Sequence, residues 1–211
     1  LSLVGDCSQS LGTYYKGKSS LDYYDYSVVS FYPTKILSAY GDAGMIFIKK
    51  NLKNKALLLK NNGHSIKNKS DCKILGINSR MDSLQAYILN NKLRNLNKVL
   101  KIKNKYAKIL RKNLPSKFSL PKIDQNVKSN NYILSFYVNE NSVKKFIIYM
   151  QKNNISCRII YEKLLSENKV LRPIIKTKLT NASNCKKTLV SIPSHERLNL
   201  RQFMFIIKTI K

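Results

Sequence analysis

Acidic residues are scarce in this sequence of 211 residues, which has 11 Asp and Glu against 39 Lys and Arg and a formal net charge of +28. Such an excess of cations is typical of proteins that bind nucleic acid, anionic membranes or anionic substrates. Arginine, which contacts bases and phosphates through paired hydrogen bonds, is itself scarce among these cations. The cations are also scattered along the whole chain. A base-composition bias in the gene therefore explains the charge better than specific nucleic-acid binding, although non-specific binding at low salt is expected.

Cysteine and histidine are also rare. The four cysteines (Cys7, Cys72, Cys157 and Cys185) lie far apart and form no CxxC pair, and the chain has two histidines. A metal site is therefore not expected. Free thiols in a reducing compartment are the default for such a pattern.

Long apolar runs are absent, and no stretch reaches the length needed to cross a membrane, so no membrane partner is expected. The chain also lacks an initial Met. It begins at Leu1 in an apolar run that reads as a strand already under way. The sequence is therefore interpreted as truncated upstream, with room for one domain and a half.

Strand and helix patterns alternate along the chain, which predicts the α/β class. The first part is expected to contain strands at 2–5, 26–32 and 45–48 and helices at 51–62 and 81–114. The second part is expected to contain strands at 132–138, 155–161 and 188–192 and helices at 142–153 and 198–210. A polar connector with two prolines predicts a boundary between domains at 1–115 and 116–211.

The segment 81–114 fits either one bent helix or two consecutive helices. Every charged residue from Lys92 to Lys112 is a cation, which is interpreted as a solvated helix face.

Three short segments carry the residues that could do chemistry. Asp6-Cys7-Ser8-Gln9 puts an acid and an amide at a strand end, and Ser30-Phe31-Tyr32-Pro33-Thr34-Lys35 puts a lysine just past another strand. The loop Gly76-Ile77-Asn78-Ser79-Arg80 leads into the long helical segment. Taken singly, each has an ordinary explanation: a solvated lysine, or an Asp or Asn that caps a helix.

Together, in this order and spacing, the three segments resemble the DegT/DnrJ/StrS family of sugar-nucleotide aminotransferases, which depend on pyridoxal phosphate. The resemblance includes Tyr40-Gly41-Asp42-Ala43-Gly44, Leu84-Gln85-Ala86 and, near the end, Ser191-Ile192-Pro193-Ser194-His195. It implies fold type I of the pyridoxal-phosphate enzymes, the aspartate-aminotransferase-like architecture. Residues 1–115 would be the C-terminal part of the three-layer α/β/α large domain, with a mostly parallel sheet, and 116–211 the smaller α/β domain.

The resemblance also implies roles for five residues. Lys35 would hold the cofactor covalently and move the proton as general base, and Asp6 would face the pyridine nitrogen. Gln9 would border the ring, and Ser30 would bind the phosphate. Asn78 would reach the phosphate of a partner's cofactor, which implies a homodimer with composite sites. Arg80 would either help with the phosphate or pair with a helix acid such as Asp82.

The implied reaction moves an amino group, usually from glutamate, onto a keto group of a nucleotide-linked sugar for glycan biosynthesis in the cytoplasm. The retained Lys35 favours amination over the dehydration that relatives with histidine perform, and the residues around it favour carbon 3 of the sugar. The usual motifs differ at Lys60-Asn61-Asn62-Gly63 and at 161–166, and the expected upstream half of the pocket is absent from this sequence. A non-catalytic family member and a basic nucleic-acid-binding protein therefore remain the alternatives.

Overall fold

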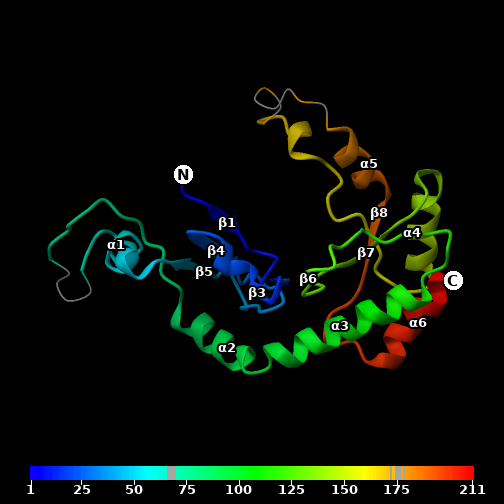
Figure 1. The fold of residues 1–211 in the computed structure, drawn as a ribbon, viewed down its shortest axis with the longest axis horizontal. Coiled ribbons are helices and arrows are strands. Elements are labelled where there is room, and N and C mark those ends of the chain that lie inside the picture. The colour runs from blue at the N-terminus through cyan, green and yellow to red at the C-terminus, as the bar shows by residue number, and fades with distance from the viewer. Residues whose placement is uncertain (66–69, 172, 174–176, 178) are drawn as a thin grey trace. The chain divides into compact units, whose positions relative to one another are not determined.

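The computed structural model describes residues 1–65, 70–171, 173, 177 and 179–211 (Figure 1). Contacts divide the chain into two compact units. The first contains Leu1–Leu100 and Gln125–Tyr132, and the second contains Lys101–Asp124 and Ile133–Lys211. The chain therefore passes between the units more than once. The domain boundary predicted between 1–115 and 116–211 stays a prediction.

The first unit is built on a three-stranded sheet in the order β1-β4-β5. Strand β1 (Val4–Asp6) pairs with β4 (Tyr26–Ser30) in parallel, and β5 (Gly44–Ile48) pairs with β4 in the antiparallel sense. One parallel pair fits the expected topology, and the antiparallel strand adds a feature that the sequence pattern did not indicate. Val29 is 1% exposed and anchors this sheet to a small core.

A second small sheet lies in the same unit, in the order β3-β2-β6. Strands β2 (Tyr14–Tyr15) and β3 (Lys18–Ser19) form a hairpin whose turn residues, Lys16 and Gly17, both have positive φ. Two consecutive residues with positive φ suit the twist of a tight hairpin. Strand β6 (Val127–Lys128) pairs with β2, so a late segment of the chain completes this sheet.

The helices of the first unit follow the sheet in sequence. A 3₁₀ turn, η2 (Lys50–Leu52), leads into α1 (Lys53–Leu59), and α2 (Ser83–Leu93) comes next (Figure 1). Helix α3 (Leu96–Asn113) begins after a short break and belongs to the second unit from Lys101 onward. The segment 81–114 therefore forms two consecutive helices, one of the two alternatives that its pattern allowed. Another 3₁₀ turn, η1 (Ser20–Tyr23), precedes β4.

The second unit has its own core around an antiparallel pair of strands, β7 (Leu134–Tyr137) and β8 (Leu189–Ile192). Helix α4 (Val143–Lys152), preceded by η3 (Glu140–Ser142), and helix α6 (Leu200–Ile210) contribute their apolar faces. Burial of these faces is the main stabilising term for such short elements. The fully buried side chains of this core include Phe136, Met150, Val190 and Phe203.

Two predictions in the second unit were incomplete or wrong. The expected strand at 155–161 is not formed, because only Arg158 bridges to the sheet, opposite Ser191. Helix α5 (Thr180–Thr188) was not expected at all, and a 3₁₀ turn, η4 (Leu165–Glu167), precedes it. No described helix is both long and apolar enough to cross a membrane.

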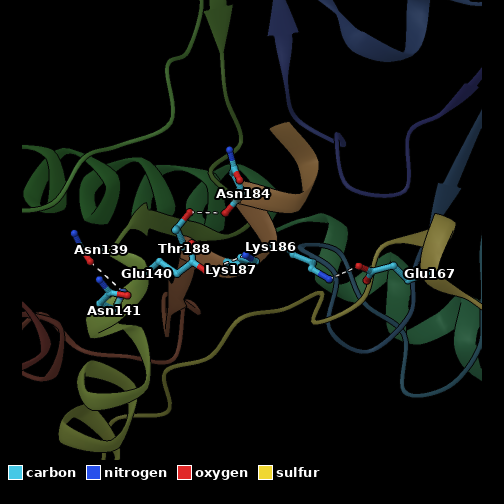
Figure 2. Close-up of polar contacts among 8 residues, drawn as sticks. All are labelled: Asn139, Glu140, Asn141, Glu167, Asn184, Lys186, Lys187 and Thr188. Atoms are coloured by element: carbon cyan, nitrogen blue, oxygen red, sulfur yellow. Dashed lines mark hydrogen bonds and ion pairs between the residues drawn. The ribbon is translucent and has the colours of Figure 1, made fainter. Parts of the chain in front are cut away.

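Polar contacts fasten α5 and its neighbours (Figure 2). Lys186 pairs with Glu167, and the Lys187 Nζ lies 2.9 Å from Glu140 Oε1. At the end of the helix, the Thr188 hydroxyl donates to the Asn184 carbonyl oxygen at 2.8 Å. The two ion pairs depend on tertiary partners and not on an apolar repeat, which explains why the sequence pattern did not reveal this helix.

Candidate active site

The parallel pairing of β1 and β4 brings two of the expected site residues to one edge of the sheet. Asp6 is the last residue of β1, opposite Val28 of β4, and Ser30 ends β4 two residues further on. The carboxyl ends of neighbouring parallel strands open onto the same crevice in α/β proteins. Asp6 and Ser30 thus present a carboxylate and a hydroxyl on the side where the chain turns away from both strands.

The Asp6 carboxylate is held in its charged form by its surroundings. Oδ1 accepts a hydrogen bond from the Ser8 backbone N–H at 3.0 Å. The pKa of Asp6 lies below its usual value, chiefly because of the Ser8 side chain and then the Ser8 backbone N–H; burial opposes this, and the charge of Lys35 adds to it. Lys35 and Asp6 are therefore close enough to interact electrostatically.

Lys35 closes a turn that the preceding residues fix. Its backbone N–H donates to the Tyr32 carbonyl oxygen at 2.8 Å. Phe31, only 4% exposed, anchors the turn in the core, and its N–H donates to the Ala43 carbonyl oxygen at 2.8 Å. The Lys35 ammonium lies 5.4 Å from the centroid of the Tyr132 ring, within the range of a cation–π contact. The lysine is thus held by a rigid turn, with its side chain half-exposed.

Ser30 has a local partner. Its hydroxyl oxygen accepts the Tyr32 backbone N–H at 3.3 Å. The side chain is half-buried, at the junction between β4 and the turn that carries Lys35. A hydroxyl in this place can donate its proton to an anion while its oxygen still accepts from Tyr32.

Asn130 and Tyr132 were not identified from the sequence. Asn130 is 5% exposed, and its amide donates to the Gln9 carbonyl oxygen at 2.8 Å and to the Leu11 carbonyl oxygen at 3.0 Å. Its Oδ1 accepts the Tyr132 N–H at 3.0 Å, and the Tyr132 hydroxyl lies 3.4 Å from Thr34 Oγ1. No local pattern reveals the contacts with Gln9, Leu11 and Thr34, because these partners lie about a hundred residues away along the chain.

The surroundings of Gln9 and Asn78 differ from those of Asp6, Ser30 and Lys35. Gln9 has an exposed side chain, while its backbone is fastened to Asn130. Asn78 is exposed and bridges Asn61 in the segment between α1 and α2. Among the described residues, no hydrogen bond or ion pair links the Asn78 side chain to Asp6, Ser30 or Lys35.

The side chain of Arg80 supports the same segment. Its Nη1 donates to Asn61 Oδ1 at 2.8 Å. Among the described residues, the ion pairs do not include one between Arg80 and Asp82, the N-cap residue of α2. Arg80 therefore braces the loop that carries Asn78.

Comparison with known proteins gives relatives along the whole chain. A UDP-4-amino-4,6-dideoxy-N-acetyl-beta-L-altrosamine transaminase of Campylobacter jejuni is 28% identical over 99% of this chain and 57% of its own length. A UDP-2-acetamido-2-deoxy-3-oxo-D-glucuronate aminotransferase of Pseudomonas aeruginosa is 34% identical over 50% of this chain and 29% of its own length. The chain thus spans little more than half the length of the Campylobacter jejuni relative.

Solved structures share the fold. A DegT DnrJ EryC1 StrS aminotransferase from Brucella abortus superposes with a TM-score of 0.91 at 23% identity, over 100% of this chain and 56% of its own. The architecture is therefore the C-terminal part of fold type I, as the resemblance implied. The model of the DegT/DnrJ/EryC1/StrS aminotransferase family, whose members depend on pyridoxal phosphate, matches residues 1–211, and the chain belongs to this family.

Proposed function

We propose that the whole protein carrying this chain is a pyridoxal-phosphate-dependent aminotransferase that transfers an amino group to a keto group of a nucleotide-linked sugar. The observation that carries this proposal is the placement of Asp6 and Ser30 at the carboxyl ends of the parallel strands β1 and β4, with Lys35 in the turn that follows β4. Membership of the family supports the same reaction class.

The residues present fit the cofactor. When bound, pyridoxal phosphate supplies an electron sink, which works best if its ring nitrogen is protonated. Asp6 would favour that proton, since its own pKa is lowered and it stays a carboxylate near neutral pH. Lys35 would hold the cofactor and, once released, carry a proton on its amine. Ser30 would donate to the phosphate, and Gln9 would border the ring.

The sugar and the donor are proposed from the same grounds. The Pseudomonas aeruginosa relative is named for a 3-oxo sugar, which supports amination at carbon 3. Glutamate is proposed as the donor from the resemblance to the family. The Campylobacter jejuni relative is named for a 4-amino sugar, so carbon 4 is the alternative that product analysis would distinguish. A nucleotide-sugar substrate for glycan biosynthesis makes the cytoplasm the expected location, without a membrane or a specific nucleic acid as partner.

We also propose a homodimer with composite sites, in which Asn78 reaches the cofactor phosphate of the partner subunit. Large apolar side chains close to Asn78 in the sequence support this arrangement, because Leu75 is 95% exposed, Ile77 69%, Leu84 66% and Tyr87 68%. Exposed apolar residues gathered in one region are typical of a surface that another protein covers. A second copy of the same chain would cover them and complete the site.

Absorbance spectroscopy of the whole protein with pyridoxal phosphate tests the function. We expect a visible band from the lysine-bound cofactor that glutamate bleaches and that Lys35→Ala removes. Lys55→Ala, which changes an exposed lysine of α1, is the matched control and should keep the band. A folded dimer without this band would contradict the proposal and favour a non-catalytic family member.

A further inference from the structure

The cofactor lysine is followed by a short loop, 36–43, that returns to strand β5. The residues in the middle of this loop are packed into the hydrophobic core. Leu37 is 6% exposed and Ala39 1%, and the Ala39 N–H donates to the Phe31 carbonyl oxygen at 2.7 Å. The residues that follow, Tyr40 and Gly41, have no such burial, and Tyr40 is 68% exposed. Other contacts must hold this exposed part of the loop.

Helix α2 supplies those contacts from one face. Gln85, Leu89 and Lys92 are spaced four and three residues apart, so they lie on the same side of the helix. Leu89 is 7% exposed and belongs to the core cluster that contains Leu37 and Ala39. The central residue of this face is thus packed, while the two flanking residues are polar.

Gln85 fixes the far end of the loop. Its Oε1 accepts the Tyr40 backbone N–H at 2.8 Å. A Cβ at Gly41 would come within 3.3 Å of Gln85 Nε2, so the loop backbone passes very close to this side chain. Glycine at 41 permits this close approach.

Lys92 fixes the near end. Its ammonium donates to the Ser38 carbonyl oxygen at 2.7 Å and to the Ser38 hydroxyl oxygen at 3.0 Å. It also lies 4.5 Å from the centroid of the Tyr40 ring. Three contacts from one charged group are charge-assisted and directional. Lys92 is therefore not part of a solvated cationic face, contrary to the interpretation from the sequence.

We infer that Gln85 and Lys92 are positioning residues that hold the loop behind Lys35 and thereby fix the orientation of the cofactor lysine. The Lys35 turn and the loop share their anchor at Phe31, which bonds Ala39 on one side and Ala43 on the other. If the loop moved at Ser38 and Tyr40, the turn that carries Lys35 would move with it. The effect on catalysis rests on the proposed function. The contacts of Gln85 and Lys92 with the loop, here called the brace, are a property of the chain itself.

Hydrogen exchange of the whole protein without cofactor tests the brace directly. In Gln85→Ala and Lys92→Met we expect the backbone amides at 38–41 to exchange about tenfold faster, which is the effect of losing one charge-assisted or well-aligned hydrogen bond. Lys92→Arg, which can still donate and stack on Tyr40, should restore slow exchange. Lys98→Met, an exposed lysine at the start of α3, is the matched control and should leave these amides unchanged.

Kinetics of the loaded enzyme then test positioning. Lys92→Met should lower kcat about tenfold with little change in the KM for the amino donor, because Lys92 would orient Lys35 without touching the donor. Unchanged exchange at 38–41 in Lys92→Met overturns the inference, whatever the activity. Faster exchange with wild-type kcat would overturn the positioning role alone. A wild-type protein that takes up no pyridoxal phosphate would overturn the proposed function, while the exchange result still decides the brace.

Discussion

The ring of Tyr106 on α3 stacks on the ring of Phe203 on α6, with centroids 4.1 Å apart and planes inclined by 14°. Phe203 is fully buried, and Tyr106 is 3% exposed. The Tyr106 hydroxyl also donates to the Leu198 carbonyl oxygen, just ahead of α6. One residue of α3 therefore holds the last helix through both packing and a hydrogen bond.

Truncation of Phe203 should strongly destabilise the second unit. We expect Phe203→Ala to lower the free energy of unfolding by about 3–5 kcal/mol, from lost burial and the cavity left behind. Phe205→Ala, two residues along the same helix at 52% exposure, should cost less than about 1 kcal/mol. Urea denaturation of both variants measures the difference. Equal losses in the free energy of unfolding of the two variants would mean that the stacked Phe203 stabilises the unit no more than the exposed Phe205 does.

Lys103 gives the second unit a pH dependence of stability. It is 6% exposed, and burial lowers its pKa from 10.5 to about 8, although Glu196 acts in the opposite sense. In the unfolded chain this lysine keeps its proton up to pH 10.5, so between these pH values the unfolded state binds more protons. The free energy of unfolding should therefore rise by about 2 kcal/mol from about pH 7.5 to 9.5.

The variant Lys103→Met isolates this effect. It removes the titrating group and should flatten the rise between these pH values, whereas Lys101→Met, an exposed neighbour on α3, should keep it. Denaturation curves at several pH values make the measurement. A rise that persists in Lys103→Met would assign it to other groups.

Gly63 is a position where a side chain cannot fit. It has a φ of +78°, and a Cβ there would come within 1.7 Å of the Ile74 carbonyl oxygen. Gly63→Ala should therefore open the segment that carries Asn78 and weaken the proposed dimer by tenfold or more, roughly the effect of 1.4 kcal/mol or above. Sedimentation of the whole protein measures it.

A matched control exists in the hairpin turn. Gly17 has a φ of +80°, but no atom lies within 4 Å of the place that a Cβ would take, so Gly17→Ala carries the backbone strain without the clash. It should leave the dimer intact and cost about 1 kcal/mol of stability. If both variants dissociate equally, backbone strain and not the collision at Ile74 is the cause.

The cysteines should differ sharply in reactivity. Cys157 is 2% exposed, and burial raises its pKa to about 12, so almost no thiolate exists at neutral pH. Cys72 is exposed. Mass spectrometry after brief alkylation of the native protein should find Cys72 labelled and Cys157 protected, with both labelled after denaturation. Labelling of native Cys157 at the rate of Cys72 would contradict the packing of the second core.

The sequence predicted elements whose own residues determine them. Strand β4 is β-branched and aromatic and ends before Pro33, and α6 has a regular apolar repeat from Phe203 to Ile210. Both formed close to the expected residues. The apolar run at 155–161 lacked a partner along most of its length, since only Arg158 bridges to Ser191, and so it did not become a strand.

The candidate site was predictable only where a short motif carries it. Asp6 and Lys35 stand in local segments, and their approach follows from two strands that lie in parallel. Asn130 and Tyr132 were missed because their partners lie about a hundred residues away along the chain. Lys92 and Lys103 were misread as solvated, because a run of cations along a helix does not indicate which of them meets a carbonyl oxygen or a core.

The path of the chain has a consequence for inheritance. Strand β6 and Asn130 belong to the first unit, yet the chain reaches them only after it has passed through Lys101–Asp124 of the second. A single breakpoint in the gene always divides at least one of the two units, and a breakpoint within Lys101–Asp124 separates β2 from its partner strand β6. The two units are therefore expected to be inherited together, and chimaeras that exchange one whole unit between relatives would need three breakpoints, one at each place where the chain passes from one unit to the other.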